Sequence, residues 1–207
     1  MMQAPNQHAH EYVDLGLPSG TLWATENIKD TNGNELYFAW GETIGYTAEQ
    51  VLDGKHVFRW NDYKFGFDID DKVIYGLTKY NDMDGLTFLE PEDDAATQNW
   101  GAGWQMPSKE QFEELLAGTT HEWTEVNDIK GLLCTSKTNG NTVFFAAVGG
   151  VEDGDIDGVG DFGLYWSDSL NRMNVFRACF FSFGDCSHDM PRNRRYCGYS
   201  VRPVYFN

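Results

Sequence analysis

Basic residues are scarce in this sequence. Its 207 residues include 15 lysines and arginines against 32 aspartates and glutamates, for a net charge of −17. Such a surface repels phosphate backbones and anionic membranes, which argues against nucleic-acid or lipid binding by the body of the protein. Long apolar runs are missing too, and none approaches the roughly 18 residues of a membrane span. The opening MMQAPNQHAHE has neither the basic region nor the apolar core of a secretion signal, so localisation stays open.

Cysteine is also sparse. The four cysteines, at positions 134, 179, 186 and 197, show no Cys-x-x-Cys spacing, and no histidine is placed to complete a zinc site. We therefore expect no structural metal and free thiols, with a disulfide as the alternative for an exported protein. The chain has no Gly-x-Ser-x-Gly, P-loop or dinucleotide motif, and no histidine neighbours a serine or cysteine in a nucleophile-like context. These absences predict that the protein is not an enzyme and needs no cofactor.

Two motifs suggest calcium. Asp153, Asp155, Asp157 and Gly158 have the spacing that opens an EF-hand loop, but Leu164 occupies the position that needs a bidentate glutamate. We expect a solvated turn here, with adventitious calcium as the alternative. Trp-Asn-Asp at 60–62 and Glu-Pro-Glu at 90–92 resemble the sugar-binding triplets of animal C-type lectins. Their order is reversed and Glu92 replaces an asparagine, so we treat both as coincidence.

The patterns that are present predict an α+β protein. Residues 1–10 form a polar tail, and residues 11–207 are long enough for one domain, with 41% hydrophobic residues for its core. One helix is expected in LEPEDDAATQNW, with Pro91 at its first position and Glu92 to Asp94 in its first turn. A second is expected after Ser108, whose capping box uses Gln111, and it ends before Gly118.

Short strands with tight turns are expected elsewhere. EYVDLGLPSGTLWATENI predicts two strands around a Pro-Ser-Gly turn, and a further strand is expected over 36–40. GLLCTS and TVFFAAVG flank KTNGN, which predicts a hairpin. LYWSDSL, RACFFSF and YSVRPVYF complete the β-rich half. Residues 44–85 show no sustained period and are expected to be long ordered loops or an insertion, and the Gly/Asp-rich residues 149–163 are expected to be a loop.

The last 41 residues use a narrower set of amino acids. After Trp166 there is no lysine, glutamate, glutamine or tryptophan, and six arginines face three aspartates. Codons that end in a pyrimidine cannot encode those four types or methionine. Randomised Asn codons of the form A-A-pyrimidine would therefore yield this vocabulary, with only Met173 and Met190 outside it. Chance is the alternative explanation.

Several blocks carry a family resemblance: EYVDLGLPSGTLWAT, YFAWGE, LEPEDDAATQNWGAGWQMPS, TSKTNGN, LYWSDSL and GYSVRPV. Together, over residues 11–205, they resemble the bacterial FISUMP, or major paralogous, domain family. GWQMPSKEQFEELL and the closing GYSVRP also resemble the formylglycine-generating-enzyme subgroup of the C-type lectin fold. The resemblance implies that fold, with two helices, small twisted antiparallel sheets and long loops.

Members of this family include variable proteins of diversity-generating retroelements, whose 3′ gene ends are rewritten at adenines. The frame of such proteins is matched by Tyr165, Trp166, Ser167, Ala178, Phe181, Phe183, Met190, Arg195, Gly198 and Val201. The residues between them, in a variable region of about 168–199, become candidate ligand-binding positions. These are Arg172, Asn174, Phe176, Arg177, Phe180, Ser182, Ser187, Asp189, Arg192, Asn193, Arg194, Tyr196 and Tyr199.

The spacing supports a two-faced strand. Phe181 and Phe183 lie two apart, which places Phe180 and Ser182 on the opposite face. We expect at least two of Phe176, Phe180 and Tyr196 to be exposed, since exposed aromatics and arginines favour binding. The resemblance implies a non-catalytic protein at a cell or phage surface that binds a protein or glycan. The alternatives are a surface domain of the family that is not diversified, and a copper-dependent oxidase of the formylglycine-generating type.

Overall fold

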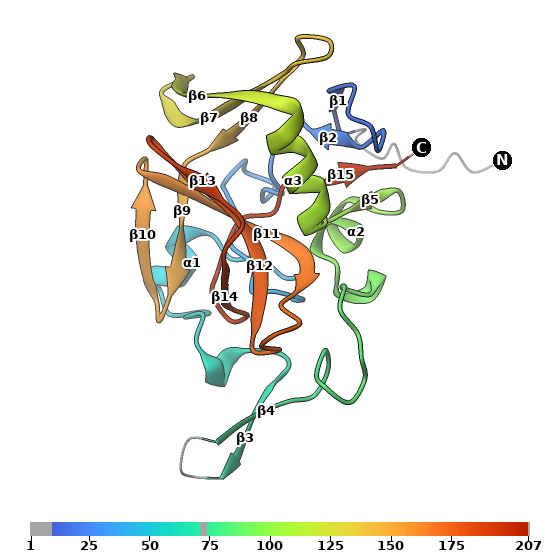
Figure 1. The fold of residues 1–207 in the computed structure, drawn as a ribbon. Coiled ribbons are helices and arrows are strands. Elements are labelled where there is room, and N and C mark those ends of the chain that lie inside the picture. Colours follow the sequence, from blue (N-terminus) through green and yellow to red (C-terminus); the bar gives the residue numbers. More distant parts are fainter. Residues whose placement is uncertain (1–9, 71–73, 207) are drawn as a thin grey trace, which may run out of the picture.

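The computed structural model describes residues 10–70 and 74–206, and it shows a mixed α+β protein built mainly from small antiparallel sheets (Figure 1). The predicted polar tail lies outside the described residues except for His10, whose ring stacks on Trp100 with the centroids 3.6 Å apart. The α-helices are α1 (Ala48–Leu52), α2 (Ala95–Trp100) and α3 (Lys109–Gly118), and two short 3-10 turns are η1 (Trp60–Asp62) and η2 (Pro91–Asp93).

A six-stranded sheet forms the centre of the fold. Its strand order is β10-β9-β11-β12-β13, and β14 also pairs with β12. All of these pairs are antiparallel except β9 with β11, which meet at Gly149 and Gly163. The strands are β9 (Val148–Glu152), β10 (Asp155–Val159), β11 (Phe162–Leu170), β12 (Arg177–Gly184), β13 (His188–Asp189) and β14 (Arg192–Arg194).

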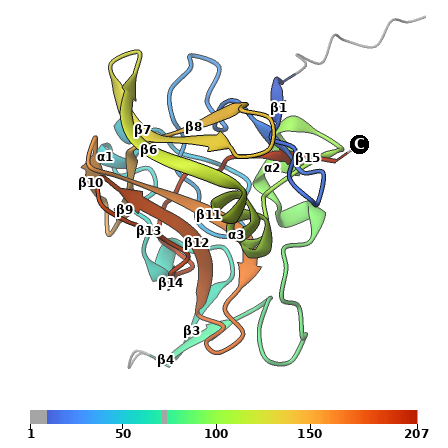
Figure 2. The same ribbon diagram turned by 45° about the horizontal axis from the view of Figure 1, so that its top comes forward.

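Three smaller sheets surround this centre. The first has the order β1-β2-β15-β5, the second is β6-β7-β8, and the third is the hairpin β3-β4, which projects from the body (Figures 1 and 2). The strands are β1 (Tyr12–Asp14), β2 (Leu22–Ala24), β3 (Gly66–Asp70), β4 (Ile74–Leu77), β5 (Trp104–Gln105), β6 (Thr119–Val126), β7 (Ile129–Ser136), β8 (Thr142–Ala146) and β15 (Val204–Tyr205). The sheet containing β15 brings the C-terminal segment beside β2, near the start of the chain.

One predicted helix is confirmed and the other begins later than expected. Ser108 caps α3 through the predicted capping box with Gln111, and the helix ends at Gly118, one residue later than predicted. The prediction that the first helix begins at Pro91 is wrong. Asp94 has an extended ψ of 114°, which ends the η2 turn, and its carboxylate accepts the Thr97 N–H, so α2 begins at Ala95.

The hairpin predictions had mixed outcomes. The Pro-Ser-Gly turn does join β1 and β2, and KTNGN does join β7 and β8. The prediction of a Gly/Asp-rich loop over 149–163 is wrong, because residues 148–159 form the β9–β10 hairpin. This hairpin turns at Asp153 and Gly154, which both have a positive φ. The strand predicted over 36–40 is reduced to isolated bridges at Tyr37 and Phe38. Residues 44–85 are not loop alone: they contain α1, η1 and the β3–β4 hairpin.

Strands β11 and β12 separate two apolar clusters. On one side Tyr165, Phe181 and Phe183 pack with Phe112 of α3, which lies over these strands (Figure 2). On the other side Trp166 packs in a cluster that includes the segment 36–40 and the C-terminal residues 197–201. The central strands are thus covered on both faces, and this decides which side chains of the C-terminal region reach solvent.

Candidate functional site

The ten residues matched to the family frame are all buried. Their polar groups are paired inside the core: the Tyr165 hydroxyl donates to the Ala146 carbonyl at 2.7 Å, and the Ser167 hydroxyl donates to the Cys179 carbonyl at 2.8 Å. Trp166 Nε1 donates to the Phe38 carbonyl at 2.8 Å. These bonds join β11 to neighbouring segments, so the frame residues support the fold.

Arg195 is the most unusual member of the frame, because its guanidinium is completely buried. Its Nε donates to the Tyr63 hydroxyl at 2.8 Å, and its other nitrogens donate to the carbonyls of Lys79, Tyr80 and Val175. The rings of Trp40 and Tyr63 lie 4.7 and 5.4 Å from the guanidinium carbon, close enough for cation–π attraction. Arg195 therefore fixes the 79–80 and 175 segments to the end of β14.

Most of the thirteen candidate positions reach solvent. Eight are exposed: Arg172, Asn174, Phe176, Arg177, Ser187, Asp189, Arg192 and Arg194. Three are partly buried, namely Ser182, Asn193 and Tyr196, and two are buried, namely Phe180 and Tyr199.

The structure corrects the predicted site at Phe180 and Tyr199, which were expected at the surface and are buried. The Phe180 ring lies 4.8 Å from the Tyr199 ring and 5.7 Å from the Trp166 ring, and both side chains are under 7% exposed. The spacing correctly placed Phe180 opposite Phe181, but that second face of β12 is covered as well. The expectation that two of the three aromatics would be exposed is also wrong, because Phe176 is exposed and Tyr196 only partly so.

An aromatic group lies where β12 begins. The ring of Trp60 lies 5.7 Å from the Phe176 ring and 6.4 Å from the Tyr196 ring. Arg194 lies 5.9 Å from the Tyr196 ring centroid and forms an ion pair with Glu152 at 2.6 Å. Burial raises the pKa of Tyr196 to about 12, so its hydroxyl stays protonated and donates to Glu152. We call Phe176, Arg194 and Tyr196, with Trp60 and Glu152 beside them, the aromatic surface.

Sequence reasoning missed Trp60 and Glu152 as members of this surface. Trp60 belongs to the Trp-Asn-Asp triplet that was set aside as coincidence, and Glu152 lies in the segment predicted as a loop. No local pattern links either residue to position 194 or 196. The fold brings Trp60 beside Phe176, and hairpin β9–β10 carries Glu152 to Arg194.

A separate pocket of about 320 Å³ lies near the start of α3. Lys109 and Glu110 line one side, residues 169–173 another, and Cys179 and Arg192 contribute from β12 and β14. Two of the candidate positions, Arg172 and Arg192, therefore share this pocket. Burial raises the pKa of the Cys179 thiol, so the sulfur stays protonated and is a poor nucleophile.

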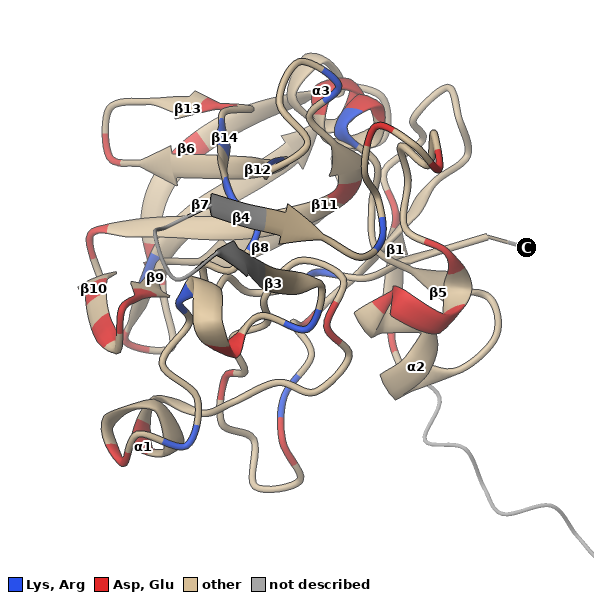
Figure 3. Ribbon diagram, turned by 90° about the horizontal axis from the view of Figure 1, so that it is seen from below, with Lys and Arg blue, Asp and Glu red and all other residues tan. Residues whose placement is uncertain are grey.

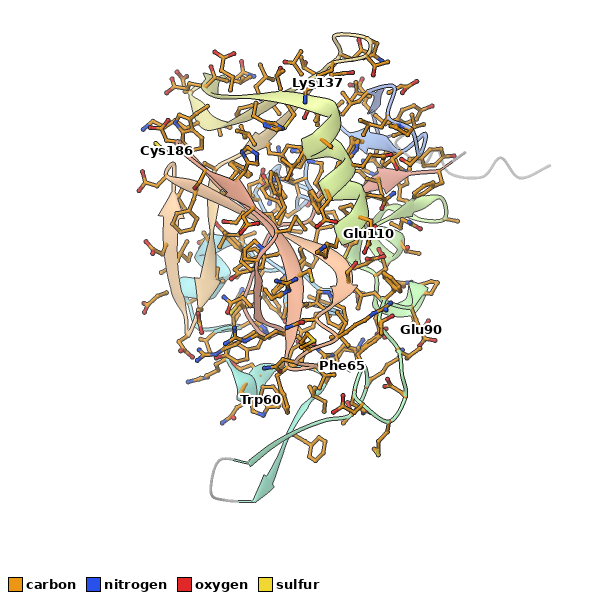
Figure 4. All side chains as sticks on the ribbon, in the orientation of Figure 1. Trp60, Phe65, Glu90, Glu110, Lys137 and Cys186 are labelled. Carbon is orange, nitrogen blue, oxygen red and sulfur yellow. The ribbon has the colours of Figure 1, made fainter. Side chains whose placement is uncertain are left out.

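Ser182, Ser187 and Asp189 lie at the far end of β12, whereas Arg177 and Asn193 lie near its start and Asn174 in the segment before it. Ser182 pairs with Asp189 of β13, and Ser187 precedes that strand. Arg177 is the first residue of β12 and Phe183 its last but one, which places them roughly 20 Å apart at about 3.3 Å per residue. Trp60 and Cys186, which adjoins Ser187, lie toward opposite ends of the molecule in Figure 4. The structure therefore separates Ser182, Ser187 and Asp189 from the candidates of the aromatic surface and of the pocket.

The acidic residues suspected of binding calcium are spread along the β9–β10 hairpin, with Asp153 in the turn and Asp155 and Asp157 on β10. A different acidic cluster, formed by Glu90, Glu92 and Asp93, has carboxylate oxygens within 4.8 Å of one another. Lys79 Nζ occupies its centre, at 2.5 Å from Glu90, 3.2 Å from Glu92 and 2.6 Å from Asp93. This ammonium group and that of Lys64, which lies 2.6 Å from Asp93, offset part of the charge that a metal ion would otherwise balance, and Lys79 fills the space between the carboxylates.

The cysteines form no disulfide: all four are free, and Cys134, Cys179 and Cys197 are buried. No family model, curated protein or solved structure matches this chain. Within residues 10–70 and 74–206, no helix has the length and apolar character to cross a membrane.

Proposed function

We propose that this protein is a non-catalytic ligand-binding protein that displays a diversified C-terminal face on a C-type lectin-like scaffold. One observation carries the proposal: the ten frame residues are buried, whereas eleven of the thirteen positions between them are exposed or partly exposed. Substitution at an exposed position usually changes stability by no more than about 0.5 kcal/mol. A scaffold with this division can vary its surface and keep its core.

The chemistry of the surface suits binding. Aromatic rings and arginine are the residue types that contribute most at protein interfaces, and the aromatic surface contains both. A ligand would bury the exposed ring of Phe176 and pair with or displace the Arg194–Glu152 ion pair. The proposed partner is a protein or glycan on another cell or particle.

Sequencing the genomic neighbourhood tests the diversification. We expect a nearby repeat that differs from codons 168–199 only where the repeat has adenine, next to a reverse transcriptase gene. If neither is present, the protein is an ordinary surface domain that is not diversified.

Binding is tested with a glycan array and a phage-displayed dodecapeptide library, both applied to the full chain. The triple variant Phe176→Ala, Arg194→Ala, Tyr196→Ala should lose at least about tenfold in affinity for the ligands found. Its melting temperature should change by only a few degrees, since these side chains lie at the surface.

A matched control removes an acid, an apolar group and a cation from the exposed β6–β7 hairpin: Glu125→Ala, Val126→Ala, Lys130→Ala. This control should keep full affinity. If both triple variants bind the ligands equally well, the aromatic surface is not the binding site.

A further inference from the structure

The C-terminal region forms a basic island on an acidic protein. Figure 3 shows basic segments on β12 and β14, and residues 167–207 carry six arginines against three aspartates. Three of these arginines, at 172, 177 and 192, are exposed and make no ion pair within residues 10–70 and 74–206. These arginines stay unpaired although the chain has 32 acidic residues, so they are available to a carboxylate of a bound ligand.

The register between β12 and β14 concentrates this charge. Arg177 lies directly opposite Arg194, and Cys179 lies opposite Arg192. Like charges at opposed positions of an antiparallel pair destabilise it. The carboxylate of Glu152 pairs with Arg194 and so offsets the charge of that arginine only. Arg192, the member of these strands that lines the pocket, keeps its charge unpaired among the described residues, so an anion bound beside it would lower the positive charge that the strands concentrate.

The pocket beside these strands offers more than charge. Arg172 and Arg192 line it from two segments, and the apolar side chains of Phe88 and Met173 at its wall are 43% and 93% exposed. Glu110 adds a carboxylate on the α3 side. A densely charged anion, such as a sulfated glycan, would be repelled by Glu110. A peptide segment with a single carboxylate bears less of this cost, and its backbone N–H groups can donate to Glu110.

We propose that this pocket binds an exposed segment of a partner protein that carries an aspartate or glutamate next to an apolar side chain. The arginines pair with the carboxylate, and Phe88 and Met173 cover the apolar neighbour. Arginine suits this role because its planar guanidinium can donate two parallel hydrogen bonds to one carboxylate. The inference rests on the proposed ligand-binding function and names the chemistry of the ligand.

To test this, peptides that bind the full chain are selected from a phage-displayed dodecapeptide library, and their affinities are measured. We expect peptides that combine an acidic with an apolar residue, and their binding should weaken as salt rises. The double variant Arg172→Ala, Arg192→Ala should lose at least about tenfold in affinity, and Arg172→Lys, Arg192→Lys should lose part of it. Lys130→Ala removes an exposed cation from β7 and should bind as the wild type does.

Each other outcome overturns the inference in a recognisable way. Acidic peptides that bind the double alanine variant at full strength would place their site elsewhere and leave the proposed function intact. Recovered peptides without acidic residues would reject the ligand chemistry alone. Heparin that binds with the same arginine dependence, in place of peptides, would make the ligand a sulfated glycan. If neither peptides nor arrayed glycans bind the wild type, both the pocket assignment and the proposed function fail.

Discussion

Neutralising the buried carboxyl of Glu42 should change how the stability of this protein depends on pH. Glu42 is 8% exposed, and its Oε1 accepts the Lys64 N–H at 2.8 Å. Its Oε2 lies 3.7 Å from Nε2 of His56, too far for a hydrogen bond. Burial raises the pKa of Glu42 to about 7, although the Lys64 hydrogen bond opposes the shift, and burial lowers the pKa of His56. Both groups are therefore neutral at a pH between the lowered pKa of His56 and the raised pKa of Glu42.

The tighter binding of a proton in the folded state decides in which direction the stability changes with pH. A carboxyl with a raised folded-state pKa holds its proton more tightly in the folded state than in the unfolded one. Its contribution to stability is complete below the ordinary pKa of 4.5 and is lost as the pH rises through about 7. Since one pKa unit corresponds to about 1.36 kcal/mol, this shift is equivalent to about 3 kcal/mol. Burial also raises the pKa of Asp168 to about 7, which has the same sign.

The variant Glu42→Gln isolates the effect, because glutamine stays neutral and can still accept the Lys64 N–H. The free energy of unfolding in urea should be measured for both proteins at pH 4 and at pH 8. Relative to the wild type, the free energy of unfolding of the variant should be about 3 kcal/mol higher at pH 8 than at pH 4. At a few degrees per kcal/mol, this corresponds to roughly 6–12 °C in melting temperature. Glu125→Gln, which removes an exposed carboxylate from β6, is the control. A difference between Glu42→Gln and the wild type that stays constant with pH would refute the reasoning.

Four further predictions concern the core and the acidic cluster. Phe183→Ala should lower the free energy of unfolding by about 3–5 kcal/mol, as expected for a buried aromatic, and a mild effect in urea unfolding would contradict its place in the core. Phe180→Ala should cost about as much, whereas a loss under about 1 kcal/mol would return it to the surface. Arg195→Lys should cost about 2–4 kcal/mol in thermal unfolding, because lysine cannot reach the same acceptors; an unchanged melting temperature would count against the buried clamp. Calcium at about 1 mM should not raise the melting temperature, because Lys79 occupies the acidic cluster, and an increase would reveal a site there.

The sequence predicted helix caps and turns correctly where the interacting residues lie close together in the chain. Ser108 and Gln111 are three residues apart and form the capping box in which each satisfies the other's backbone N–H. The Asn-Gly turn of the β7–β8 hairpin depends on residues that are adjacent in the chain. The start of α2 is not where the sequence predicts it, because two possible N-cap positions, Glu90 and Asp94, lie four residues apart. The carboxylate of Asp94 also accepts the Met106 N–H from outside the helix. That second contact is not visible from sequence.

The candidate site was predicted in part for the same reason. The alternation of Phe180 with Phe181 shows that the two side chains point to opposite faces of β12, and the structure agrees. Alternation cannot say what covers each face. The residues that bury Phe180 are Trp166 and Tyr199, which come from a neighbouring strand and from the segment after β14.

By itself, the sequence determined the α+β composition, the capping box of α3 and the turns of the β1–β2 and β7–β8 hairpins. These properties depend on residues a few positions apart, or on composition. Only the tertiary structure decided which of the thirteen candidate positions reach solvent, that Trp60 joins Phe176 and Tyr196, and that Arg172 and Arg192 share one pocket. Each of these depends on contacts between segments far apart in the chain, whose positions follow from the packing of the whole molecule.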